Sequence, residues 1–150
     1  MIIGIDVGGT KASALLVDAG STTVVDRERT SSAGDGPALV AALAALVAAL
    51  RDRSLEPVEA VGLGIAGLTN RSGTVTWSPN LQGAVGHPVG PELEQTVGLP
   101  VTVSNDATAA TLAEARFGAG RDCDDLALVT LGTGIGGGFV LGGHLQQGAH

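Results

Sequence analysis

The residues best suited to chemistry lie near the start of the chain, where a glycine-rich turn separates two apolar runs. The runs cover residues 2–5 and 12–17, and the turn contributes Asp6, Gly8, Gly9, Thr10 and Lys11. This order predicts two antiparallel strands joined by a loop whose backbone can approach an anion closely. The amides of Gly8, Gly9 and Thr10 would contact phosphate oxygens, and Asp6 would hold a metal ion. The same residues also fit an ordinary hairpin, because Gly-Gly is common in turns.

A second glycine-rich segment repeats this pattern late in the chain. An apolar run at 126–131 leads into glycines at 132–138, and Phe139 begins another apolar run. Gly132, Gly134 and Gly137 have the spacing of the dinucleotide-binding fingerprint, but that fingerprint opens a helix, whereas a strand is predicted here. A Walker-type loop is excluded because the only lysine follows Thr10 and is not followed by Ser or Thr. With these two nucleotide-binding motifs excluded, the interpretation left is a pair of glycine hairpins that could bind a polyphosphate between them.

Two further polar residues, Asn105 and Asp106, lie between a predicted strand at 100–104 and a predicted helix at 107–116. Ligand sites in α/β sheets usually lie at this edge, where strands end and helices begin. Asp106 could therefore act as a general base, which contributes roughly 10²–10⁴-fold to a rate. It could instead cap the helix, a role worth about 1 kcal/mol. Asn105 could cap the helix equally well, so capping does not require both residues.

Composition narrows the class of protein. The chain has 150 residues, of which 44% are hydrophobic and 15% charged, so it can bury a core in roughly one domain. A net charge of −7 without a basic run argues against nucleic acid or an anionic membrane surface as partner. The longest apolar stretch, 37–50, is shorter than the about 20 residues of a membrane span. The N-terminus lacks a signal-peptide pattern and Cys123 is the only cysteine, so we expect a cytoplasmic protein.

The segments between these motifs predict an α/β domain. A strand is expected at 22–29, and an amphipathic helix begins near Asp35 and Pro37. Its apolar stripe consists of Leu39, Leu43, Leu46 and Leu50. A buried strand at 60–65 would run parallel to the first, and a hairpin at 69–80 and a short helix at 91–97 would follow. We expect one lobe over residues 1–117 and the start of a second over 118–150.

Three motifs in this order resemble the ROK family of sugar kinases and repressors, and in particular its bacterial glucokinases. They are Asp6-Val-Gly-Gly-Thr-Lys11, Asn105-Asp106-Ala107 and Leu131-Gly-Thr-Gly-Ile-Gly-Gly-Gly138. The resemblance covers essentially the whole chain. The family belongs to the sugar kinase, heat-shock protein 70 and actin superfamily. The resemblance therefore implies a ribonuclease H-like (actin-like ATPase) lobe with a mixed five-stranded sheet, followed by the first hairpin of a second similar lobe.

The resemblance also implies an activity, that of an ATP-dependent hexose kinase. A glucokinase of this kind transfers the γ-phosphate to the 6-hydroxyl of glucose or a related sugar. Asp6 would hold Mg²⁺ through water, and Asp106 would be the general base. The two phosphate loops would consist of Gly8, Gly9, Thr10 and Lys11 and of Gly132, Thr133, Gly134 and Gly136. Hydrogen bonds to the sugar would come from Gly67, Asn80, Asn105 and Asp106.

Two departures from the family pattern affect these expectations. A Trp often follows the Asn-Leu of the sugar loop in the family, whereas Trp77 precedes Asn80 here. The family's Gly-Glu-x-Gly-His sugar contacts and cysteine-rich zinc loop come later than the last residue, so His144 and His150 are interpreted as exposed loop residues. A structural zinc and a homodimer are expected only of a longer chain, and little or no turnover is expected of these 150 residues. The hexose, and ATP or polyphosphate as donor, stay open.

Two other functions fit the same motifs. A sugar-responsive regulator of the family would carry a helix-turn-helix before the first phosphate loop, but Met1 leads directly into the first strand. A sugar-binding domain without catalysis would have no need of Asp6 and Asp106. A kinase is therefore the leading interpretation.

Overall fold

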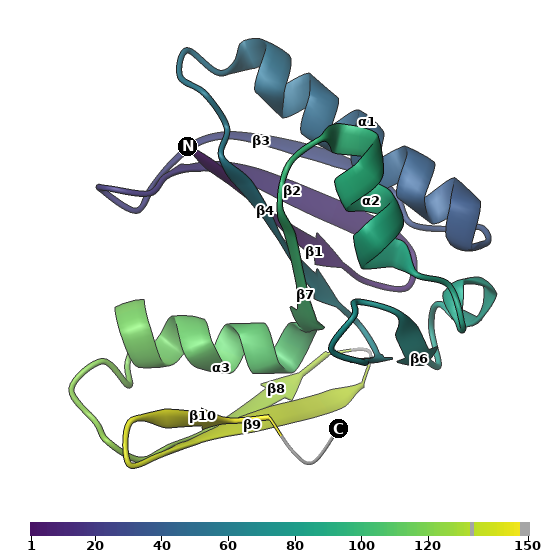
Figure 1. The fold of residues 1–150 in the computed structure, drawn as a ribbon. Helices are drawn as coiled ribbons and strands as arrows, with labels where there is room; N and C mark the ends of the chain where they lie inside the picture. Colours follow the sequence, from purple (N-terminus) through teal and green to yellow (C-terminus); the bar gives the residue numbers. More distant parts are fainter. Residues whose placement is uncertain (133, 148–150) are drawn as a thin grey trace. The chain divides into compact units, whose positions relative to one another are not determined.

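The computed structural model describes residues 1–132 and 134–147. Contacts divide the chain into two compact units, Met1–Ser104 and Asn105–His150. Figure 1 shows the helices and strands of both units along the chain.

A mixed five-stranded sheet organises the first unit, in the order β3-β2-β1-β4-β7 (Figure 1). Its strands are β1 (Ile2–Val7), β2 (Lys11–Asp18), β3 (Thr23–Ser31), β4 (Ala60–Ile65) and β7 (Val101–Asn105). Strand β1 pairs antiparallel with β2 and parallel with β4, and β2 pairs antiparallel with β3. The predicted mixed five-stranded sheet and the predicted parallel pairing of 60–65 with the first strand are confirmed.

Burial alternates along β1, so that one face of the strand is part of the hydrophobic core and the other face carries Asp6. Ile3, Ile5 and Val7 are buried, whereas Ile2, Gly4 and Asp6 lie on the other face of the strand. The buried face joins one hydrophobic cluster with the leucine stripe of α1 (Gly36–Arg53), namely Leu39, Leu43, Leu46 and Leu50. Full burial of each such side chain contributes about 1.5–3 kcal/mol. A strand period of two therefore puts Asp6 on the face of β1 opposite this core.

Helix α1 has the predicted ends. The carboxylate of Asp35 accepts a hydrogen bond from the amide of Ala38 at 3.0 Å and caps the helix, with Pro37 in its first turn. Arg51 and Arg53 lie in its last turn, where cations interact favourably with the helix dipole.

The connection from β4 to β7 carries a small hairpin and a helix. The hairpin pairs β5 (Leu68–Thr69) with β6 (Val75–Trp77), and a 3-10 turn, η1 (Gln82–Ala84), follows it. Helix α2 (Val89–Val97) begins two residues before the predicted 91–97, because Val89 is fully buried and its turn packs into the core. The left-handed conformation of Gly98, with φ of 67°, ends α2.

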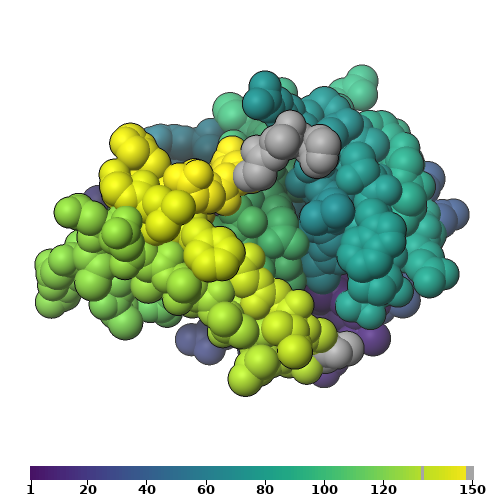
Figure 2. Space-filling view, turned by 90° about the horizontal axis from the view of Figure 1, so that it is seen from below, coloured from purple at the N-terminus to yellow at the C-terminus, as the bar shows by residue number. Residues whose placement is uncertain are grey.

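The second unit consists of α3 (Asp106–Phe117) and a three-stranded sheet. The strands are β8 (Leu126–Leu131), β9 (Ile135–Leu141) and β10 (His144–Gln146), all paired antiparallel in the order β10-β9-β8. Helix α3 packs against β8 and β9 (Figure 1). Burial alternates along β8 and β9, and the exposed face of this hairpin carries the apolar side chains of Val129, Leu131, Ile135, Phe139 and Leu141. Figure 2 shows the surface of both units from below. The predicted hairpin of a second lobe is present and has a third strand.

The second glycine loop is shorter than predicted. Strand β9 already begins at Ile135, so Gly136, Gly137 and Gly138 belong to a strand and not to a loop. A Cβ atom on Gly136 would lie 2.9 Å from the Cβ of Ala107, and one on Gly138 would collide with the hydroxyl of Thr111. These two glycines therefore allow α3 to approach β9, which the spacing of glycines along the sequence does not reveal.

The same contacts place α3 with the second unit. Ala107 and Thr111 are buried against β9, and the compact units divide between Ser104 and Asn105. The sequence interpretation placed this helix in a lobe ending at 117. That lobe boundary, 1–117 and 118–150, stays a prediction.

Replacement of Arg53 is expected to change how stability depends on pH. Its Nε lies 2.6 Å from Asp26 and its Nη1 3.1 Å from Glu28. The hydrogen bond from Arg53 lowers the pKa of Asp26. The pKa of Glu28 is lowered first by the hydrogen bond from the Arg29 amide and second by the hydrogen bond from Arg53. A carboxyl group with a lowered pKa in the folded state stabilises the fold at pH values above its ordinary pKa of about 4. This stabilisation is lost as the pH falls through the pKa of the folded state.

We therefore expect Arg53→Gln to reduce the urea midpoint at pH 7 and to have a smaller effect at pH 3. Arg51→Gln is the matched control, because Arg51 Nη1 donates to the carbonyl of Val97 at 3.0 Å, an acceptor that does not titrate. An Arg53→Gln effect of equal size at both pH values would contradict the assignment.

Thr22 adopts an unfavourable backbone conformation in the turn between β2 and β3. Its φ is 55°, a left-handed value that costs a β-branched residue roughly 1–2 kcal/mol. We expect Thr22→Gly to raise the free energy of unfolding by about 0.5–1 kcal/mol, because glycine adopts this φ without steric cost. Thr23→Gly, one residue later in β3, should lower it instead. Chemical denaturation of both variants measures the difference, and a loss of stability in both would contradict the prediction.

Candidate functional site

The first glycine turn forms a closed hairpin between β1 and β2. The amide of Gly8 donates to the carbonyl of Lys11 at 2.9 Å, and Lys11 is the first residue of β2. Gly8 is therefore engaged within the hairpin, although the sequence suggested its amide as a phosphate contact. Among the described residues the amides of Gly9 and Thr10 donate no backbone hydrogen bond, so these two remain as donors to an anion.

Ser32 fastens this hairpin to the end of β3. Its hydroxyl donates to the carbonyl of Gly8 at 2.6 Å, and its amide donates to the carbonyl of Thr10 at 3.2 Å. Its side chain is buried, with 1% exposure. The sequence interpretation missed Ser32 as a site residue, since a contact across 24 residues leaves no local signal.

Asp6 lies next to the hairpin on an exposed part of β1. In register it faces Ser13 on β2 and Gly64 on β4, so one of its neighbours has no side chain. The carboxylate is therefore beside the hairpin turn at residues 8–11, which we call the phosphate hairpin after its predicted role, at the carboxyl end of a central strand. This arrangement suits Mg²⁺, which typically binds one or two carboxylates together with water and substrate phosphates.

The predicted sugar residues Gly67 and Asn80 are brought together by Ser78. The buried hydroxyl of Ser78 donates to the carbonyl of Ala66 at 2.6 Å and accepts from the amides of Asn80 and Leu81 at 3.3 and 3.0 Å. A Cβ atom on Gly67 would lie 2.9 Å from the Cβ of Ser78. Ser78 was also missed, although its position in Ser-Pro-Asn is typical of a serine that bonds nearby amides in a turn.

The phosphate hairpin contacts the segment that carries Asn80, residues 78–87, which we call the sugar loop after its predicted role. A Cβ atom on Gly9 would lie 2.6 Å from the Cβ of Asn80 and 3.2 Å from its carbonyl oxygen. Gly9 has an ordinary φ, so it is this close approach, rather than its backbone conformation, that requires glycine. The structure thus brings Asp6, the hairpin and Asn80 together within the first unit.

His87 and two glycines hold the sugar loop against the helices. His87 Nε2 lies 2.8 Å from the Glu92 carboxylate in the first turn of α2. The His87 ring also packs directly on Gly36 at the start of α1, where a Cβ would collide with it. Gly83 in turn approaches the carbonyl of Gly34, which a Cβ would reach at 2.6 Å. The loop that carries Asn80 therefore rests on the first turns of both helices.

In the second unit, Asn105 and Asp106 divide two roles between them. The Asn105 side chain is the helix cap, because its Oδ1 accepts from the Thr108 amide at 3.0 Å. Asp106 Oδ1 accepts from Asn105 Nδ2 at 3.0 Å and from the Ala107 amide at 2.8 Å. Its other oxygen, Oδ2, has no hydrogen-bond partner within residues 1–132 and 134–147. The arrangement orients the carboxylate and leaves Oδ2 able to accept a proton.

The predicted second phosphate loop is only partly described. The amide of Gly132 donates to the carbonyl of Gly134 at 2.9 Å, between the end of β8 and the start of β9. A Cβ on either glycine would meet nothing within 4 Å, so no described neighbour requires glycine at these two positions. Thr133 lies outside the described residues, as does His150. Gly136 lies in β9 under Ala107 and belongs to the packing of α3.

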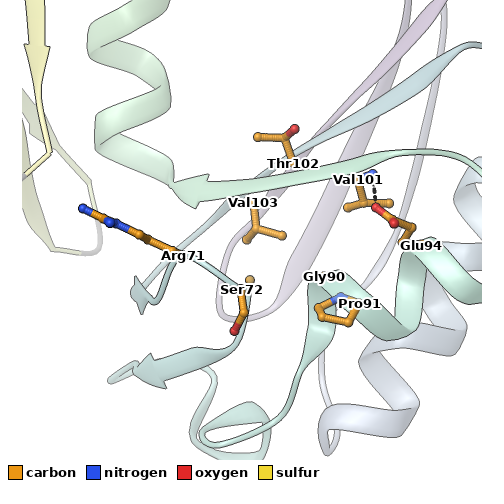
Figure 3. Close-up of a pocket in the computed structure, with 9 residues that line it drawn as sticks. Arg71, Ser72, Gly90, Pro91, Glu94, Val101, Thr102 and Val103 are labelled. Atoms are coloured by element: carbon orange, nitrogen blue, oxygen red, sulfur yellow. Dashed lines mark hydrogen bonds between the residues drawn. The ribbon is translucent and has the colours of Figure 1, made fainter. Parts of the chain in front are cut away.

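A hollow of about 340 Å³ lies elsewhere in the first unit (Figure 3). The turn of the β5–β6 hairpin, the start of α2 and β7 surround it, and the Glu94 carboxylate at its edge accepts from the Val101 amide at 2.9 Å. None of the predicted site residues lines it. The described residues contain no group of three or more His, Cys, Asp or Glu side chains that could hold a metal ion. No described helix is both long and apolar enough to cross a membrane.

Comparison with known proteins decides the family, because the ROK family pattern matches residues 2–150. The chain belongs to the ROK family. A glucokinase of Streptomyces coelicolor is 38% identical over 149 residues, which cover 99% of this chain and 46% of the glucokinase. An N-acetylmannosamine kinase of Escherichia fergusonii is 37% identical over 148 residues, which cover 97% of this chain and 49% of that kinase. The chain thus spans about half the length of these curated ROK relatives.

Solved structures of the ROK family have the same fold. A ROK glucokinase of Streptomyces griseus, in complex with glucose and AMPPNP, matches with a TM-score of 0.89 and 40% identity, over 99% of this chain and 46% of that one. A ROK transcriptional regulator homologous to the E. coli MLC protein matches with a TM-score of 0.88 and 28% identity, over 99% of this chain and 38% of that one. The expected actin-like ATPase fold of ROK sugar kinases is confirmed. ROK kinases and ROK regulators are both among the structural relatives of this chain.

Proposed function

We propose that this chain is the N-terminal part of an ATP-dependent hexose kinase that transfers the γ-phosphate to the 6-hydroxyl of glucose or a related sugar. The observation that carries this proposal is the contact between the phosphate hairpin and the sugar loop at Gly9 and Asn80, beside the carboxylate of Asp6. A donor phosphate and an acceptor sugar bound to these two loops would lie next to each other. Phosphoryl transfer depends chiefly on such positioning and on neutralising charge.

The first unit would bind both substrates. The amides of Gly9 and Thr10 would donate to phosphate oxygens, with Gly8 and Lys11 closing the hairpin beneath them. Asp6 would hold Mg²⁺ through water, and the bound ion would neutralise charge on the phosphates. Asn80 and the backbone at Gly67 would bond sugar hydroxyls.

The second unit would contribute the second phosphate loop. This loop would consist of Gly132, Thr133 and Gly134, and Gly136 would support it from β9.

Asp106 would act as the general base. Its Oδ1 is held by Asn105 and the Ala107 amide, which leaves Oδ2 to accept the proton of the 6-hydroxyl. The sugar oxygen then forms a bond to the γ-phosphorus while the bond from that phosphorus to the β–γ bridging oxygen breaks, and ADP leaves. Asn105 would donate to a neighbouring sugar hydroxyl as well as capping α3. The complete gene product would work as a cytoplasmic homodimer.

A ROK regulator that binds sugar without phosphorylating it is the second candidate. The match to the ROK transcriptional regulator supports it, because that protein has the same fold over 99% of this chain. The kinase is favoured because Asp6 and Asp106 are both present and Asp106 is oriented by two hydrogen bonds.

The test is formation of sugar phosphate by the complete gene product with a panel of sugars, with ADP release measured in addition when ATP is the donor. Glucose, mannose and N-acetylmannosamine should be compared, each with ATP and with polyphosphate as donor. We expect sugar-dependent turnover with ATP, strongest with glucose, and little or none from the 150 residues alone. Sugar binding by calorimetry without phosphorylation of any sugar by either donor would instead support the regulator.

A further inference from the structure

We propose that two buried hydroxyls, those of Ser32 and Ser78, are positioning residues that each set one substrate loop. Ser32 would position the phosphate hairpin for the nucleotide, and Ser78 would position Asn80 for the sugar. The inference rests on the proposed kinase function and adds to it two residues that would not touch either substrate.

Ser32 holds the phosphate hairpin through two backbone carbonyls, those of Gly8 and Thr10. Its hydroxyl bonds the Gly8 carbonyl at 2.6 Å and its amide bonds the Thr10 carbonyl at 3.2 Å. Gly9 and the amide of Thr10 lie between these two anchors. Glycines have many accessible backbone conformations, so a loop of this kind keeps its amides aimed at one point only if its ends are fixed.

Ser78 holds the sugar loop in the same way. It bonds the Ala66 carbonyl, one residue before Gly67, and the amides of Asn80 and Leu81. One buried oxygen therefore joins the backbone on either side of the proposed sugar contacts. With the hydroxyl removed, the Asn80 and Leu81 amides lose their acceptor and the loop is free to shift.

The two serines bond different segments, so their effects should separate. Among the residues that the structure describes, the hydroxyl and amide of Ser32 bond residues 8 and 10, and the hydroxyl of Ser78 bonds residues 66, 80 and 81. A general loss of stability would weaken the binding of both substrates, whereas loss of one anchor should weaken mainly one.

The experiment measures KM for ATP and for glucose, together with kcat, in the complete gene product. We expect Ser32→Ala to raise the KM for ATP at least about fivefold and the KM for glucose less than about twofold. Ser78→Ala should do the reverse, and kcat should change less than either affected KM. If Ser78→Ala does not fold, Ser78→Cys keeps nearly the same volume and permits the same comparison.

Two control variants separate positioning from stability. Ser54→Ala removes an equally short bond, from its hydroxyl to the Glu56 carbonyl at 2.6 Å, at the end of α1. Val47→Ala removes buried apolar volume from α1, so it lowers the unfolding midpoint without touching either loop. Both should leave the two KM values unchanged at temperatures where the protein is folded.

The outcomes distinguish this inference from the proposed function. Opposite selectivity of the two serine variants supports the inference. Equal changes in both KM values, or no change in either, would overturn it while the kinase function stands. Absence of sugar-dependent ADP formation by the unmodified protein would instead overturn the kinase function, and with it this inference.

Discussion

Asp106→Asn in the complete gene product is expected to lower kcat for glucose phosphorylation by about 10²–10⁴-fold, the usual contribution of a general base. Asn retains an oxygen that can accept from the Ala107 amide and from Asn105, so the start of α3 should keep its geometry. The substituted amide cannot take up the proton of the 6-hydroxyl. The KM for glucose should therefore change by less than about threefold, because binding and proton transfer are separate contributions.

Asp122→Asn is the matched control for this prediction. Asp122 belongs to the same unit, and its side chain is 88% exposed with a long 3.4 Å contact to Arg121. Its substitution should leave kcat and KM unchanged. If Asp106→Asn kept more than about a tenth of the activity, proton transfer would be assigned to the wrong carboxylate.

Gly9→Ala is expected to have the second-largest effect. The added methyl group would lie 2.6 Å from the Asn80 Cβ and 3.2 Å from the Asn80 carbonyl oxygen, so the phosphate hairpin and the sugar loop must move apart. Such overpacking typically costs about 1–3 kcal/mol of stability. We also expect the KM for glucose to rise at least about tenfold, because Asn80 would be displaced from the position in which it is proposed to bond the sugar.

Gly8→Ala is the local comparison for the loss of stability. A Cβ on Gly8 would lie 3.5 Å from the Lys11 carbonyl oxygen, an ordinary contact, and neither glycine has a positive φ. Gly8→Ala should therefore unfold at nearly the same denaturant concentration as the unmodified protein, whereas Gly9→Ala should unfold earlier. Equal stability of the two variants would show that Asn80 yields to the added methyl at little cost.

The predictability of this chain differs between its elements. The α1 leucines and its Asp35 cap are local patterns, and the structure confirms both of them. The parallel pairing of β4 with β1 followed from the apolar run at 60–65 and the helix that precedes it, since such crossovers join parallel strands. The mixed five-stranded sheet was expected from the family resemblance. The prediction that the second glycine loop extends to Gly138 was wrong, because Gly136 and Gly138 lie in β9. These positions require glycine because α3 packs closely against them, and not because the chain turns there.

The candidate site likewise has some features that the local sequence predicts and others that only the tertiary structure shows. The sequence by itself determined the ROK motifs, the end of β1 at which Asp6 lies, and the Asn105-Asp106 junction, all of which are written in consecutive residues. Only the tertiary structure decided that Gly9 contacts Asn80 and that Ser32 and Ser78 hold the two loops. Short-range patterns determine strands, helices and caps, because those depend on neighbouring residues. Contacts such as that of Ser32 with Gly8 form between residues that are separated in the chain and become adjacent only when the sheet assembles.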